Sequence, residues 1–152
     1  MTEADSLRVD NGVTAVWDVS LGDWDSSLDT GMESVDQQHR ALFDQIRILL
    51  DHTQANRIRE TLEFIATYAS EHFDMEERLH QETDYPYAQE QLDAHIGFMA
   101  DYRELKQEYE GNGGDLVLLM KLAKFLLDWL KEHIGKLDQK FADYFHRLQP
   151  PT

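Results

Sequence analysis

After residue 35, apolar residues recur every three or four positions, which is the spacing of helices with one buried face. The pattern predicts four helices, over about residues 36–52, 56–80 and 87–110 and from residue 115 onward. A short fifth helix over about residues 137–146 is expected to pack across the end. The predicted inward stripe of the fourth helix consists of Leu116, Leu119, Met120, Ala123, Leu126, Leu127, Leu130 and Ile134.

Short polar segments separate the predicted helices: Thr53–Ala55, Gln81–Pro86 and Gly111–Gly114, the last followed by Asp115 as a candidate N-cap. Connections this short make consecutive helices antiparallel neighbours. The sequence therefore predicts an all-α fold, an antiparallel up-down-up-down four-helix bundle. An irregular N-terminal arm precedes the bundle and a short C-terminal helix ends it.

The arm covers the first 35 or so residues and carries Trp17 and Trp24, which we expect to anchor it on the bundle. The predicted domain organisation is an N-terminal extension over residues 1–23, a helical domain over 24–146, and a tail or the start of a linker over 147–152. The final segment Leu148–Thr152 contains two prolines, which is typical of a linker as well as of an ordinary tail.

The formal net charge of −16 argues against nucleic-acid partners, because phosphate binding needs clustered Lys and Arg. It also disfavours an anionic membrane surface. The absence of cysteine excludes disulfides and thiolate metal sites. Residues 1–10 lack the apolar segment of a signal peptide, and the longest apolar run, Leu116–Met120, is too short to span a bilayer. We expect a cytoplasmic protein.

Candidate chemistry lies where polar residues interrupt the apolar stripes. His39, His72, His95 and His133 each fall on the inward face of a different helix, and Glu76 lies one turn after His72. A single inward histidine is usually a hydrogen-bonded core residue, but four with a buried carboxylate point to a metal site, since buried charges are paired or bind metal. In an antiparallel bundle these positions fall at one level, so we expect them to converge.

Asp138 follows His133 by five residues, which is about 140° off the same face of a regular helix. It reaches the same site only if the fourth helix ends or widens into a π-type turn near Gly135. Imidazoles and carboxylates without thiolates suit iron, zinc, copper or manganese. Carboxylates on two helices favour a bridged metal pair, and the His-x-x-x-Glu spacing differs from the Glu-x-x-His of carboxylate-rich di-iron bundles.

These residues resemble the hemerythrins and bacteriohemerythrins. The similarity rests on the order and spacing of several stretches and covers about residues 24–145; the stretches are Trp24–Met32, Val35–His39, His72–Glu77, His95–Phe98 and Trp129–Ile134, followed by Asp138. The resemblance implies a centre of two iron ions, oxo- or hydroxo-bridged when oxidised. It also implies that dioxygen binds end-on at one iron as a hydroperoxide while both irons pass from ferrous to ferric, with no catalytic residue of the protein.

The resemblance assigns His39 and His72 to one iron, His95 and His133 to the other, and Glu76 and Asp138 to the bridges. A further histidine of the family falls at the position of Gln91, and this is the main departure. Gln91 would supply its amide oxygen, hydrogen-bond a metal-bound water, or leave the position to solvent. The nearest imidazole without an assigned role is His80, which we do not expect to replace the missing ligand. His52 and His146 are expected to be exposed residues at helix ends.

Three functional classes follow. The first is a module that binds dioxygen or small anions reversibly, as an oxygen carrier or as the sensing domain of a signalling protein with a fused or downstream partner domain. The second is a di-iron enzyme acting on peroxide or nitric oxide. The third is a metal-free interaction bundle. The imidazole-rich ligand set favours reversible binding, and the altered ligand set tilts the choice toward sensing.

Overall fold

A computed structural model describes residues 22–148, and its regular elements are all helical. A 3-10 turn, η1, precedes the bundle and occupies Ser26–Leu28. The helices that follow are α3 (Glu33–Leu50), α4 (Arg57–Glu82), α5 (Ala88–Asn112), α6 (Leu116–Asp128), the π-helical segment η2 (Trp129–Asp138) and α7 (Gln139–Arg147).

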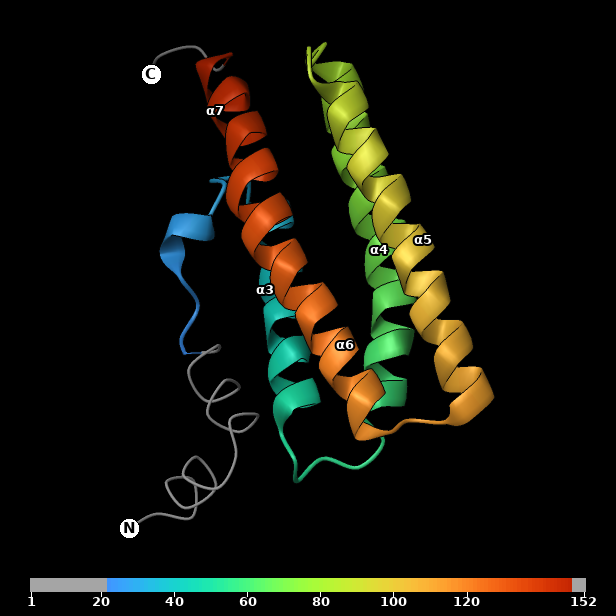
Figure 1. The fold of residues 1–152 in the computed structure, drawn as a ribbon. Coiled ribbons are helices and arrows are strands. Elements are labelled where there is room, and N and C mark those ends of the chain that lie inside the picture. The colour runs from blue at the N-terminus through green and yellow to red at the C-terminus, as the bar shows by residue number, and fades with distance from the viewer. Residues whose placement is uncertain (1–21, 149–152) are drawn as a thin grey trace.

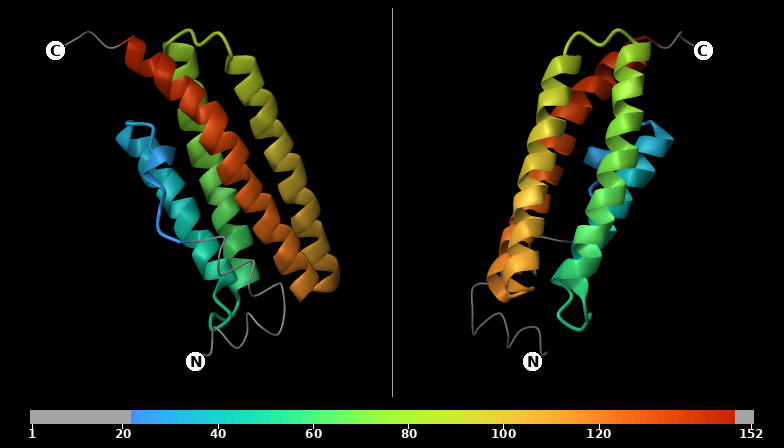
Figure 2. Two further views of the ribbon diagram at one scale, coloured as in Figure 1. Left: turned by 60° about the vertical axis from the view of Figure 1, so that its left-hand side comes forward. Right: turned by 90° about the vertical axis from the view of Figure 1, so that its right-hand side faces the viewer.

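Four rods make the bundle, and each runs opposite to the one before it in the chain (Figure 1). Helix α3 contacts α4 and α6, and α5 contacts the same two helices, so the four stand at the corners of a square. The two further views in Figure 2 agree with this arrangement. The predicted all-α bundle is confirmed. No helix within residues 22–148 is both long and apolar enough to cross a membrane.

The hydrophobic core fills the half of the bundle nearer the α3–α4 loop. Its fully buried side chains come from three helices and are chiefly Leu42, Ile46, Leu49, Ile65, Leu118, Leu122 and Leu126. Helix α5 adds Phe98 and Tyr102, whose hydroxyl donates a hydrogen bond to the Leu62 carbonyl at 3.0 Å. Burial of this apolar surface supplies the main force that holds the four rods together.

The buried stripe of α6 differs from the predicted one. Leu116 and Met120 are 56% and 41% exposed, whereas Leu118 and Leu122 are fully buried. Every residue from Leu116 to Met120 is apolar, so periodicity alone could not choose the inward face of this turn. Asp115 is the N-cap as predicted, because its carboxylate accepts a hydrogen bond from the Leu118 backbone N–H at 2.8 Å.

The predicted fifth helix exists as α7, but it does not turn across the end of the bundle. The backbone stays helical at Trp129 and at Gln139, so α6, η2 and α7 form one continuous rod, drawn from orange to red in Figure 1. Gly135 does not break the rod because the wider π-helical turns keep its backbone hydrogen bonds satisfied. Helix α7 buries Phe141 against His80 near the end of α4 and against Tyr85 in the α4–α5 loop.

The described part of the N-terminal arm is fixed to the start of α3. The buried Asp36 carboxylate accepts hydrogen bonds from the Thr30 and Gly31 backbone N–H groups and from the Thr30 hydroxyl. Trp24 packs edge-on against Phe43 with ring centres 5.5 Å apart, which confirms it as an anchor. Trp17, most of the predicted extension over 1–23 and residues 149–152 of the predicted tail lie outside the described residues.

Candidate metal centre

The π-helical segment decides whether the second carboxylate reaches the centre. Residues five apart lie on one face of a π-helix, because its hydrogen bonds join residue i to residue i+5. His133 and Asp138 both fall within η2 and are 3% and 1% exposed. Their facing atoms, His133 Nε2 and Asp138 Oδ1, are 3.2 Å apart. The conditional prediction of a widened turn is therefore confirmed.

Each carboxylate lies between an imidazole of its own helix and an imidazole of another helix. Glu76 Oε1 is 3.1 Å from His72 Nε2 and 3.2 Å from His95 Nε2. Asp138 turns its two oxygens in different directions, with Oδ2 3.2 Å from His39 Nε2 and Oδ1 toward His133. All six side chains are at most 3% exposed. The structure thus brings every sequence-predicted donor to one buried place.

The donor atoms fall into two groups that share Glu76. His39, His72, Glu76 and Asp138 each offer one atom within 4.8 Å of the others, and Glu76, His95 and His133 form a second such group. Because Asp138 also faces His133 through its other oxygen, both carboxylates touch both groups. Two adjoining positions bridged by two carboxylates match the geometry expected for a metal pair.

Several of the donor atoms are close together without being hydrogen-bonded. Buried atoms without a hydrogen-bond partner include Glu76 Oε1, His95 Nε2, His133 Nε2 and Asp138 Oδ2. Leaving buried polar atoms unpaired is costly, so such a cluster needs an explanation. A metal ion provides one: ligand atoms lie about 2.1 Å from the ion, which puts neighbouring ligands of a six-coordinate ion about 3 Å apart. The contacts described above, at 3.1–3.2 Å, fit that spacing.

Neighbouring side chains hold the imidazoles in place. His72 Nδ1 lies 2.5 Å from Gln38 Oε1, and His95 Nδ1 lies 2.8 Å from Glu77 Oε2. In both rings the outer nitrogen is the one that donates, which leaves Nε2 free to face the centre. Sequence reasoning missed Gln38 and Glu77, since each lies beside a predicted donor in the chain and no spacing rule distinguishes it from other polar neighbours.

An aromatic ring stacks on each of three imidazoles. Trp129 stacks on His133 with ring centres 3.8 Å apart, and Phe73 stacks on His95 at 4.0 Å. Tyr68 stacks on His72 at 4.9 Å. Flat contacts of this kind restrict ring rotation, so the donor atoms are preorganised before a metal binds.

The charges of the centre compensate one another. Burial and the Asp138 charge would each raise the pKa of Glu76, but the imidazoles of His72 and His95 lower it to about 2. Burial likewise opposes ionisation of Asp138, yet His133 and His39 hold its pKa well below the usual range. Burial would lower the pKa of His39, but the Asp138 carboxylate raises it. The imidazoles thus favour the ionised form of both buried carboxylates, and a bound cation would favour that form as well.

Gln91 lies inside the centre, where its amide nitrogen is hydrogen-bonded to other residues. Its amide nitrogen donates hydrogen bonds to Asp138 Oδ1 at 3.0 Å and to the Leu137 carbonyl at 3.2 Å. Its amide oxygen is buried without a partner. His80 is 2% exposed and burial lowers its pKa, but it belongs to neither donor group. His52 and His146 are exposed at helix ends, as predicted.

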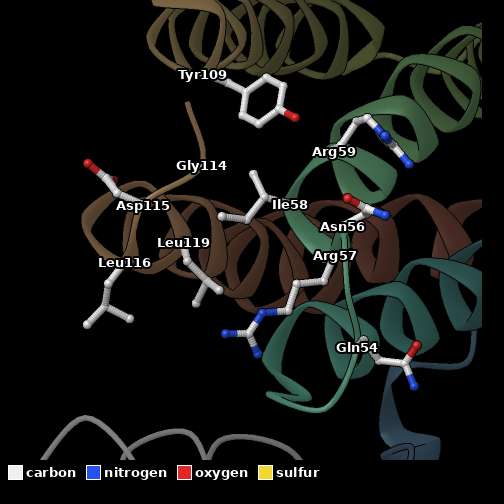
Figure 3. A pocket seen from close by; sticks show the side chains of 10 residues that line it. All are labelled: Gln54, Asn56, Arg57, Ile58, Arg59, Tyr109, Gly114, Asp115, Leu116 and Leu119. Carbon is white, nitrogen blue, oxygen red and sulfur yellow. The ribbon is translucent and has the colours of Figure 1, made fainter. Parts of the chain in front are cut away.

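Two surface hollows differ in their relation to the centre. A groove of about 400 Å³ between α5 and the α6–η2 rod is lined by His133, Trp129, Ala94 and Leu137 among others, so it leads to the second donor group. Another hollow, of about 360 Å³, lies at the opposite end of the bundle and is shown in Figure 3. Arg57, Arg59 and Tyr109 line that hollow, which contains none of the six donors.

Comparison with known proteins agrees with this geometry. The hemerythrin HHE cation binding domain family matches residues 30–145. A bacteriohemerythrin of Stenotrophomonas maltophilia (strain R551-3) is 29% identical over 123 residues, which cover 79% of this chain and 78% of that protein. A myohemerythrin of Theromyzon tessulatum is 29% identical over 118 residues, or 78% and 88% of the two chains. A hemerythrin-like protein of Naegleria gruberi is 29% identical over 119 residues, with the same coverage. Since the matched family spans most of the sequence and all six donor positions, this chain belongs to the hemerythrin family of di-iron, dioxygen-binding proteins.

Proposed function

We propose that this chain binds dioxygen reversibly at two irons, with His39 and His72 on one iron and His95 and His133 on the other. Glu76 and Asp138 would contribute carboxylate oxygens to both irons. The observation that supports this assignment is the division of the donors into two groups that share Glu76, with the two oxygens of Asp138 facing one group each. Iron held by these residues would supply the electrons for reversible dioxygen binding.

The protein's own residues provide enclosure and orientation. Gln38 and Glu77 fix the outer nitrogens of His72 and His95, and the stacked rings of Trp129 and Phe73 limit rotation. The Leu and Ile side chains of the core exclude water from one side of the centre. Low local polarity favours release of dioxygen over its irreversible reduction, because protons and water reach the centre less readily.

The test is metal content together with the optical spectrum. After anaerobic loading we expect two irons per chain, a colourless reduced form, and a visible band on exposure to air that disappears when dioxygen is removed. Asp138→Asn is expected to lose most of the bound iron, whereas Asp143→Asn, an exposed change on α7, serves as the matched control. A parent protein that takes up no iron under these conditions would contradict the proposal.

Between carrier and sensor, we favour the sensor. Asp138 ends η2 and α7 follows without a break, so a shift of this bridging carboxylate is coupled directly to the C-terminal rod. Hydrogen exchange of the α7 amides should then differ between the reduced and oxygenated forms. Equal protection of α7 in both forms would favour a carrier.

One observation favours an enzyme as the second candidate. The groove that reaches His133, together with the missing imidazole at Gln91, gives peroxide or nitric oxide a route to the second iron. Steady-state consumption of hydrogen peroxide or nitric oxide by the reduced protein decides between the two. Turnover that continues through many cycles supports the enzyme, and a single stoichiometric reaction supports the binding protein.

A further inference from the structure

Two polar side chains of the bundle interior are used by neither donor group. Gln91 and His80 are 1% and 2% exposed, and both Gln91 Oε1 and His80 Nε2 are buried atoms without a hydrogen-bond partner. Such atoms cost free energy unless something else pairs with them. A small ligand bound beside them would supply the missing hydrogen-bond partners.

The register of α4 against α5 puts these two residues at one level. Glu77 on α4 contacts His95 on α5, and the helices are antiparallel. Moving one turn along each helix, toward the loop that joins them, leads to His80 and Gln91. Both therefore lie in the layer next to the second donor group. On the far side of His80, Phe141 and Tyr85 close the layer with ring centres 4.5 and 5.3 Å from the imidazole.

Gln91 and His80 differ in how they relate to the two donor groups. His80 falls outside both groups of atoms within 4.8 Å of one another. The amide orientation of Gln91 is fixed by its two acceptors, since Asp138 Oδ1 and the Leu137 carbonyl both require an N–H group. Its oxygen is consequently an acceptor without a donor. A molecule bound between the metal and these two atoms would satisfy both.

We propose that Gln91 and His80 hold a small protic oxygen ligand, of the class of water, hydroxide or hydrogen peroxide, on the iron held by His95 and His133. This inference rests on the proposed function, and it puts the ligand at the coordination position that the resemblance assigns to a third imidazole. The ligand donates one hydrogen bond to Gln91 Oε1 and forms a second hydrogen bond with His80 Nε2. Iron and these two atoms give it three partners, the usual number for a buried water.

The same geometry predicts selectivity. Gln91 Oε1 can only accept a hydrogen bond, so it repels an anion without hydrogens, such as azide, and favours a ligand that carries a proton. The groove lined by Ala94 and Leu137 passes close to Gln91, because the Leu137 carbonyl is the acceptor of its amide nitrogen. Small ligands from solvent thus have a route to this iron.

The test is a crystal structure of the iron-loaded protein, together with pulsed EPR of its one-electron-reduced form in D2O. In the parent we expect one oxygen-sized ligand on the His95–His133 iron within hydrogen-bond distance of Gln91 and His80, and a coupling from its exchangeable deuterons. Gln91→His should replace the ligand with an imidazole and abolish that coupling. His80→Phe, which keeps a ring against Phe141, should lose the ligand, whereas His52→Phe, at an exposed position, should keep it.

The outcomes separate this inference from the proposed function. Two irons per chain with an empty position, or with Gln91 Oε1 or His80 Nε2 bonded directly to iron, would overturn the inference and leave the di-iron assignment intact. Persistence of the ligand in His80→Phe would remove His80 from the proposal and overturn it as stated. A protein that binds no iron would refute the proposed function itself, and the inference with it.

Discussion

The contact between Glu77 and His95 gives a sharp test of how the protein tunes its metal affinity. Glu77 Oε2 accepts a hydrogen bond from His95 Nδ1 at 2.8 Å, while His95 Nε2 faces Glu76 on the other side of the ring. Glu77→Leu removes this acceptor without touching any of the six donors. The imidazole then loses both its orientation and the negative charge that strengthens its Nε2 as a ligand.

The magnitude follows from the exposure of the two partners. Loss of a hydrogen-bonded partner behind a metal-bound histidine typically costs about 10- to 100-fold in metal affinity. The Glu77 side chain is 35% exposed, so water can replace part of the lost interaction and the lower end of that range applies. We expect the second iron to bind about tenfold more weakly, which corresponds to about 1.4 kcal/mol.

The assay is competition for ferrous iron between the protein and a chelator of known affinity. It measures the affinity of each of the two iron positions. Glu77→Gln should recover much of the loss, because its amide oxygen still accepts the hydrogen bond. Glu71→Leu on the same helix is the control, since Glu71 is exposed and lies outside the centre. Unchanged affinity for both irons in Glu77→Leu, or an equal loss in the control, would refute the reasoning.

Three further predictions follow from the same structure. Gln91→His should slow autoxidation of the oxygenated form, because an imidazole closes the second iron to water and anions; equal rates in stopped-flow traces of parent and variant would contradict this. The metal-free protein should be most stable between about pH 4.5 and 6.5. The pKa of Glu76 is lowered from 4.5 to about 2, so the stability that Glu76 contributes is lost as pH falls. The pKa values of His39 and His95 are raised above 6.5, so the stability that these histidines contribute is lost as pH rises. Thermal unfolding midpoints across pH 3–9 measure this, and a midpoint that keeps rising above pH 7 would oppose it. Leu126→Ala should cost about 2–5 kcal/mol in urea unfolding, since Leu126 is fully buried, whereas Leu116→Ala at a 56% exposed site should cost no more than about 0.5 kcal/mol.

Much of the candidate centre was predictable because the spacing of its residues along each helix places their side chains on one face. His72 and Glu76 share a face by their four-residue separation, and short loops bring the ends of all four helices to one level. The direction of the amide of Gln91 was not predictable, since it depends on the Leu137 carbonyl and on Asp138, both 46 or more residues away in the chain. This orientation leaves Gln91 Oε1 free to accept a hydrogen bond, as the proposed role beside a metal-bound water requires.

The sequence by itself determined the class of the fold, the antiparallel order of the helices and the candidate donors, because periodicity and loop length act locally. Only the tertiary structure decided that Trp129–Asp138 is π-helical, that α7 continues the fourth rod, and that the inward face of α6 carries Leu118 and Leu122. Each of these depends on what the other three helices present to the rod. Asp138 faces the centre because the wider turn buries its carboxylate between His39 and His133. His39 lies on another helix, so no pattern within the fourth helix alone could reveal this contact.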